Sequence, residues 1–99
     1  MKIIYENDTE KDEFESYYKE YRGDIIVQKG EKKYKIYVTT MLRLQQDCVT
    51  EQAQNGFFQV EPNTVIVQEV TKDEIERVIK KLDGCRYFER LNHLGFAEG

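Results

Sequence analysis

Cysteine and histidine are the residue types through which this sequence could carry out nucleophilic catalysis. The chain has two cysteines, Cys48 and Cys85, and one histidine, His93. A cysteine nucleophile needs a nearby base and an electropositive environment that favours the thiolate. Cys48 falls in a segment expected to be a helix facing the core, where a free cysteine is usually an inert, buried thiol. We therefore predict no catalytic residue, and we expect a domain without catalytic activity of its own.

Metal and cofactor sites are also not indicated by the spacing of the residues. A structural zinc site needs several clustered cysteine and histidine ligands, whereas the three such residues here are scattered. Glu10, Asp12 and Glu13 could together hold Mg²⁺, but acidic residues in a first helical turn are explained by the helix dipole. The six glycines are dispersed and match neither the phosphate-loop nor the dinucleotide-binding pattern. We therefore predict no metal and no cofactor.

Charge is distributed unevenly along the chain. The formal net charge is −4, yet residues 6–24 hold eight acidic and three basic residues, while residues 29–35 hold four lysines and one glutamate. Complementary charge speeds association and selects partners, so the acidic segment favours a basic protein partner. General attraction to nucleic-acid phosphates needs positive charge, which disfavours nucleic acid as the partner.

Seven tyrosines supply further candidates for a binding surface. Tyrosine combines apolar contact area with a polar tip and is enriched at interfaces. We expect Tyr18 near the edge of a helical stripe, Tyr37 on the outer face of a hairpin, and Tyr87 in the apolar tail. With the acidic segment they form the predicted partner-binding set: Glu10, Glu13, Tyr18, Glu20, Tyr37 and Tyr87.

The periodicity of apolar residues predicts the elements of the first half of the chain. Residues 2–5 are expected to form a strand, and Thr9 is expected to cap a helix. Its buried stripe has the spacing i, i+3, i+4, i+7, and the helix is expected to end near Gly23. The stripe consists of Phe14, Tyr17, Tyr18 and Tyr21. Residues 25–27 and an alternating run from Lys33 to Leu44 predict a hairpin that turns at Lys29-Gly30.

The second half contains the clearest helix boundary. The start of the middle helix lies between residues 40 and 46, and we place this helix at 45–54. Residues 57–60 are expected to be extended, and 65–67 to form a buried central strand. Thr71 and Glu74 have the spacing of a capping box at the start of the last helix. The apolar tail over residues 87–96 predicts a strand, a short helix or a partner-binding segment.

These elements predict a single domain over residues 1–99 of the α+β class. We expect two layers, with a mixed or antiparallel sheet of about four strands and about three helices. No apolar run approaches the roughly 20 residues of a membrane helix, and no signal peptide is visible. We therefore expect a cytoplasmic protein that does not bind a membrane.

The features together favour a small acidic protein-binding or regulatory domain. One form of this hypothesis is an inhibitor, such as an immunity protein that neutralises a basic nuclease. The first alternative is single-stranded nucleic-acid binding through the basic hairpin at residues 29–37, with Tyr34 or Tyr37 stacking on bases. The second is a small enzyme with a site shared across a homodimer. Whether the chain forms a homo-oligomer is left open.

Overall fold

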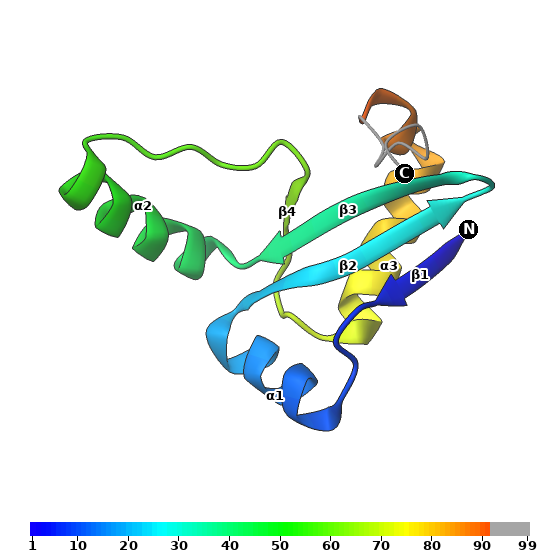
Figure 1. Cartoon of the computed structure of the whole chain (residues 1–99), viewed down its shortest axis with the longest axis horizontal. Helices are drawn as coiled ribbons and strands as arrows, with labels where there is room; N and C mark the ends of the chain where they lie inside the picture. Colours follow the sequence, from blue (N-terminus) through cyan, green and yellow to red (C-terminus); the bar gives the residue numbers. More distant parts are fainter. Residues whose placement is uncertain (92–99) are drawn as a thin grey trace.

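The computed structural model describes residues 1–91 and shows a four-stranded sheet with helices around it (Figure 1). The strands are β1 (Lys2–Tyr5), β2 (Tyr21–Lys29), β3 (Lys32–Thr39) and β4 (Thr64–Ile66). The helices are α1 (Glu10–Lys19), α2 (Met41–Asn55), α3 (Lys72–Gly84) and the 3-10 turn η1 (Phe88–Arg90). The α+β class and the order of the elements are as predicted.

The strands lie in the sheet in the order in which they follow one another along the chain. The β1–β2 and β2–β3 pairs are antiparallel, and β3 and β4 are parallel, so the sheet is mixed. The β2–β3 hairpin turns at Gly30, whose φ of 63° lies in the left-handed region that favours glycine. Parallel neighbours need a crossover connection, and the segment that contains α2 supplies it.

The hydrophobic core lies between one face of the sheet and α3. Side chains alternate along a strand, so Ile25 and Val27 of β2 share this face with the predicted alternating residues of β3. Ile75 and Ile79 of α3 are buried, and Val78 and Leu82 pack beside them, as the predicted stripe required. The buried cluster consists of Ile25, Val27, Tyr34, Ile36, Val38, Val67, Val70, Ile75, Ile79 and Phe88.

Helix α1 is capped as predicted but is shorter, and its aromatic stripe is not buried. The Thr9 hydroxyl accepts a hydrogen bond from the backbone N–H of Asp12, whose carboxylate accepts one from the N–H of Thr9. The helix ends at Lys19 because Glu20 adopts a left-handed conformation, with φ of 57°. Tyr21 therefore begins β2, and the expectation of a helix that reaches Gly23 with four buried aromatic residues is wrong.

Gly23 lies instead beside a β-bulge between Arg22 and Ile25. A Cβ atom at this position would come within 2.8 Å of the Tyr21 hydroxyl oxygen and 3.0 Å of the Tyr37 ring. The missing side chain gives the stacked Tyr21 and Tyr37 rings, whose centroids are 6.4 Å apart, room to pass over the backbone. Glycine is needed at this position for close approach, not to end a helix.

Helix α2 begins at Met41, earlier than the placement at 45–54 but within the range left open. Thr40 is its N-cap, and the Thr40 hydroxyl accepts a hydrogen bond from the N–H of Arg43 at 3.2 Å. The strand alternation expected to reach Leu44 therefore stops at Thr39. No residue of α2 is buried, so the expectation that Cys48 faces the core is wrong. Figure 1 shows α2 extending away from the sheet.

Strand β4 is a short edge strand, which corrects the prediction of a buried central strand over residues 65–67. Only Val67, just beyond the strand, is buried, and Ile66 is exposed. Residues 57–60 form no strand in the structure. An unbroken apolar run is compatible with several environments, and here the run joins the sheet at its margin.

The residues that follow α3 complete the core. Phe88 in η1 is buried, and its ring centroid lies 5.2 Å from those of Tyr34 and Tyr87. Leu91 packs against the same cluster. The remaining apolar residues of the predicted tail, Leu94 and Phe96, lie outside the described residues. The part of the tail that the structure describes is therefore a short helix that closes the core.

Candidate functional site

Exposed aromatic side chains gather on α1. Phe14, Tyr17 and Tyr18 are 62%, 48% and 69% exposed, and no residue of α1 is buried. The Phe14 and Tyr18 ring centroids are 4.6 Å apart, and Tyr17 meets Tyr18 edge to face at 6.0 Å. Large apolar rings are ordinarily buried on folding, and contiguous exposed patches of them mark interaction sites. The failed prediction of a buried stripe thus identifies a candidate surface.

Three neighbouring recesses connect these rings to the start of α2 and to β4. The first two share Tyr17 and Val70, and the second and third share Glu20 and Thr40, so the three form one continuous groove. The third recess has a volume of about 590 Å³ and lies between α2, β4 and α3. We call this surface the α1–α2 groove; its exposed apolar side chains are Phe14, Tyr17, Tyr18, Met41, Leu42 and Ile66.

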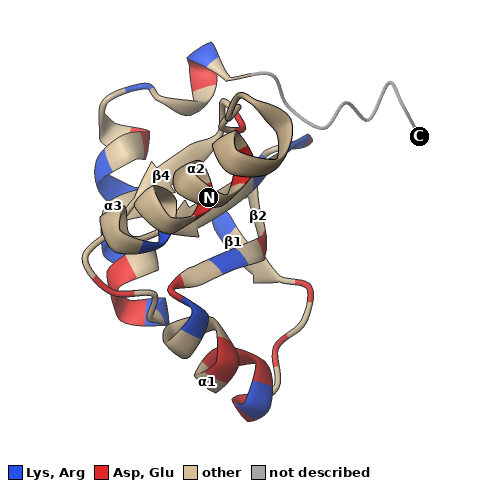
Figure 2. Cartoon of the chain, turned by 90° about the vertical axis from the view of Figure 1, so that its left-hand side faces the viewer, with Lys and Arg blue, Asp and Glu red and all other residues tan. Residues whose placement is uncertain are grey.

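Carboxylates surround the α1–α2 groove. Among the described residues that line it, the one cation is Arg77, and this side chain forms an ion pair with Glu74 at 2.8 Å. Figure 2 shows the negative charge of α1, drawn red, at one end of the molecule. The groove carboxylates are Glu10, Glu13, Glu20, Glu69 and Glu74. The surface therefore combines aromatic contact area with negative charge.

Glu20 connects the end of α1 to the start of α2. Its carboxylate accepts a hydrogen bond from the Thr40 hydroxyl at 2.7 Å, and its backbone carbonyl accepts one from the Thr40 N–H at 3.2 Å. The left-handed backbone of Glu20 directs both groups toward Thr40. Glu20 thus positions two walls of the groove in addition to contributing charge.

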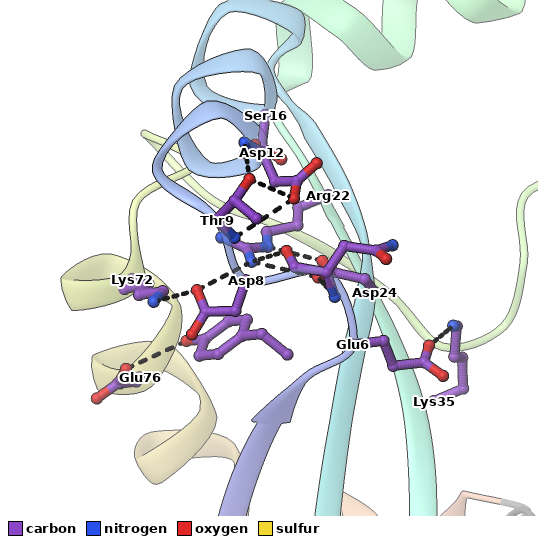
Figure 3. A network of polar contacts seen from close by, with 12 residues as sticks. Glu6, Asp8, Thr9, Asp12, Ser16, Arg22, Asp24, Lys35, Lys72 and Glu76 are labelled. Carbon is purple, nitrogen blue, oxygen red and sulfur yellow. Dashed lines mark hydrogen bonds and ion pairs between the residues drawn. The ribbon is translucent and has the colours of Figure 1, made fainter.

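A separate polar network uses other acidic residues of the 6–24 segment (Figure 3). The Arg22 side chain is only 2% exposed, and its Nε donates a hydrogen bond to Asp24 at 2.7 Å. Its Nη2 donates to the Asn7 carbonyl at 3.1 Å. Asp8 lies between Arg22 and Lys72 and pairs with both. These contacts join β1, β2 and α3, so the acidic residues in them have a structural role.

Tyr5 lies next to this network at the edge of the sheet. Its hydroxyl donates a hydrogen bond to Glu76 of α3 at 3.2 Å, and the Arg22 guanidinium lies 4.4 Å from its ring centroid. Burial and the Glu76 carboxylate raise the pKa of Tyr5 far above its usual value, so the phenol stays protonated and donates. On the other side of the sheet, Lys35 forms an ion pair with Glu6 at 2.6 Å.

The Arg22–Asp24 contact predicts a dependence of stability on pH. Burial alone would raise the pKa of Asp24, but hydrogen bonds from Arg22 and from the Asn7 N–H lower it below 3.8. Ionised Asp24 therefore stabilises the fold above its ordinary pKa, and this contribution is lost as the pH falls through the lowered value. We expect the stability gap between the parent and Asp24→Asn to shrink from about pH 5 to about pH 2 in urea unfolding. A constant gap would contradict this assignment.

The structure brings four of the six predicted partner-binding residues into the groove, and separates Tyr37 and Tyr87 from it. Tyr37 is half-buried on the sheet face opposite the core, where it stacks on Tyr21. Tyr87 is half-buried against Phe88. The expectation that these two tyrosines are the exposed ones is wrong, because neighbouring rings cover them.

The basic hairpin is used largely within the fold. Lys29 pairs with Asp83 and Lys35 with Glu6, while Lys32 and Lys33 near the turn are exposed. Tyr34 is 4% exposed in the core, so it cannot stack on a base as the nucleic-acid alternative requires. Nothing in the described hairpin favours that alternative over the groove.

Groups with catalytic or metal-binding character do not cluster in residues 1–91. Cys48 and Cys85 are free thiols on different helical segments, and His93 lies outside the described residues. Within the described range, no group of three His, Cys, Asp or Glu residues could hold a metal ion. Nor is any helix of that range long and apolar enough to cross a membrane.

Sequence reasoning missed several groove residues: Met41, Leu42, Ile66 and Glu69. Leu42 was assigned to the core face of a strand and Ile66 to a buried strand, so neither was expected at the surface. The Thr39-Thr40 pair was the available signal, because threonine favours the N-cap position and Thr40 can end the strand there. Comparisons with models of protein families, with curated proteins and with solved structures find no match for this chain.

Proposed function

We propose that this chain is a protein-binding domain that holds a basic protein partner in the α1–α2 groove. One observation carries the proposal: three exposed aromatic rings of α1 share a continuous surface with apolar side chains of α2 and β4, and five carboxylates surround them. Interface centres are enriched in aromatic residues and methionine, and their rims are polar.

The shape of the groove also supports a protein partner. Its recesses are open to solvent, whereas sites for small molecules enclose most of the surface of their ligand. A protein surface can cover a long, shallow groove, and its side chains can fill the separate recesses. Tyr17 and Tyr18 offer rigid contact area with a hydroxyl at the tip, a combination common in binding hot spots.

The charge of the groove indicates the character of the partner. Glu10, Glu13 and Glu69 form no ion pair within residues 1–91, so their charge is available to a bound molecule. The net charge of the chain has the same sign. Complementary fields raise the association rate with a basic partner and oppose acidic competitors.

Reversal of these three charges tests the proposal. We expect the triple variant Glu10→Lys, Glu13→Lys, Glu69→Lys to associate with the partner more slowly by about tenfold or more at low salt. Glu20 is left unchanged because its contact with Thr40 positions the groove. The partner is identified by capture from a lysate of the native host at low and physiological salt, and the rate is then measured by biolayer interferometry.

A matched control separates the groove from the net charge. The variant Glu31→Lys, Glu61→Lys, Glu89→Lys changes the charge equally at exposed residues outside the groove. The proposal expects a basic protein that the parent and the control capture and that the groove variant loses. Equal capture by all three proteins, or capture of an acidic protein, would refute it.

Inhibition of a nuclease is a specific form of this proposal. Enzymes that act on nucleic acids bind phosphates through basic clefts, which a surface of carboxylates and aromatic rings could occupy. If the captured partner cleaves nucleic acid, the parent protein should block cleavage and the groove variant should not. A partner that remains active in the complex would leave the binding proposal in place and exclude this form.

A further inference from the structure

Helix α2 lacks the packing that ordinarily stabilises a helix. It has 15 residues, none of them buried. Isolated helices of this length are marginal in water, and most helices in proteins are stabilised by burial of one face. Thr40 and Gly56 cap its two ends, but caps contribute only at the termini. An additional surface is therefore needed against the body of this helix.

The charged residues of α2 lie on a single stripe. Arg43, Asp47 and Glu51 have the spacing i, i+4, i+8, which places them on one side of the helix. Arg43 donates a hydrogen bond to Asp47 at 2.9 Å. The stripe lines a recess with Phe57 and Phe58 of the segment that follows α2. The charges of the helix thus face its own chain.

The opposite face of α2 is uncharged and exposed. Helical geometry places Met41, Leu42, Gln45, Val49 and Gln52 on this face, and all five are exposed, Val49 to 69%. Figure 1 shows no element over the outer side of the helix, and in Figure 2 the helix is drawn largely in tan. A face of this kind in a chain that is 34% charged is a candidate contact surface.

We propose that a second copy of this chain packs against the uncharged face of α2. Two-fold symmetry places the same patch of both copies in contact, so any charge in the patch meets its own kind. The α1–α2 groove, with its five carboxylates, would repel a second copy, whereas the α2 face contains no such group. Glutamine amides both donate and accept hydrogen bonds, so Gln45 and Gln52 can pair with their own equivalents.

Two added carboxylates test this contact. We expect the parent protein to be a dimer whose fraction rises with concentration between about 5 and about 500 μM in sedimentation velocity. The variant Gln45→Glu, Val49→Glu places like charges across the contact and should raise the dissociation constant by at least about tenfold. Because the contact also stabilises the helix, dilution of the parent should lower its circular dichroism signal at 222 nm.

The control variant Thr50→Glu, Gln54→Glu adds the same charge with the same spacing beside the charged stripe. The proposal expects this control to dimerise like the parent. A parent that is monomeric over the whole range, or a dimer that both variants leave intact, would overturn it. Loss of a captured foreign protein from the Gln45→Glu, Val49→Glu variant, with a monomeric parent, would assign the face to that protein instead. Each outcome is independent of the groove carboxylates, which these variants do not alter.

Discussion

Replacement of Arg22 by methionine should destabilise the fold by about 3–5 kcal/mol, the cost of removing one partner from a buried ion pair. The methionine would fill part of the space, but Asp24 and the Asn7 carbonyl would lose the donors that satisfy them. An uncompensated carboxylate in a nearly closed site is the main source of the loss. The measurement is the free energy of unfolding from urea titration at neutral pH.

Two further variants decide whether the loss comes from the buried charge. Arg77→Met removes an arginine from an ion pair whose guanidinium is 51% exposed, and it should cost less than about 1 kcal/mol. Asp24→Asn added to Arg22→Met removes the stranded charge and should recover part of the lost stability. If Arg22→Met and Arg77→Met had equal effects, the Arg22 network would not stabilise the fold as described.

Truncation of Phe88 to alanine should have an effect of similar size, about 3–5 kcal/mol. This ring is 1% exposed and contacts both Tyr34 from the sheet and Tyr87. Its removal leaves a cavity between β3 and η1 that the surrounding side chains can fill only in part. Thermal and urea unfolding should both report the loss.

Phe57→Ala is the matched control for this truncation. Phe57 is 63% exposed in the segment after α2, so its loss should change stability by no more than about 0.5 kcal/mol. A large effect at Phe57, or a small one at Phe88, would contradict the assignment of η1 to the core. The pair of variants also separates the role of the described tail in folding from a role in binding, since Phe88 is inaccessible in the folded chain.

The sequence supported the prediction of elements whose local signals agree with their tertiary environment. Helix α3 has a threonine cap, and its apolar residues at i, i+3, i+4 and i+7 face the core. The hairpin has period-two alternation and a glycine at its turn. In both cases the residues that favour the element are also those that its packing buries, so local pattern and fold lead to the same conclusion.

Prediction failed where apolar residues are not used for the core. The pattern of α1 is that of a buried amphipathic helix, and nothing in the spacing of Phe14, Tyr17 and Tyr18 distinguishes a core stripe from an exposed one. The burial of an element depends on where other elements lie, which single-sequence periodicity does not contain. The acidic half of the site was predictable from charge, whereas its apolar half on α2 and β4 required the fold.

The order of the chain gives the placement of α3 a consequence for synthesis. The apolar face of β2 and β3 is made from residues 25–38, but Ile75, Ile79 and Phe88, which cover it, come much later. A ribosome releases the hairpin before it has made the cover, so a partly made chain displays a bare sheet face. Chains arrested before residue 70 should therefore be the form that aggregates and that chaperones retain, while the completed chain encloses its own adhesive surface.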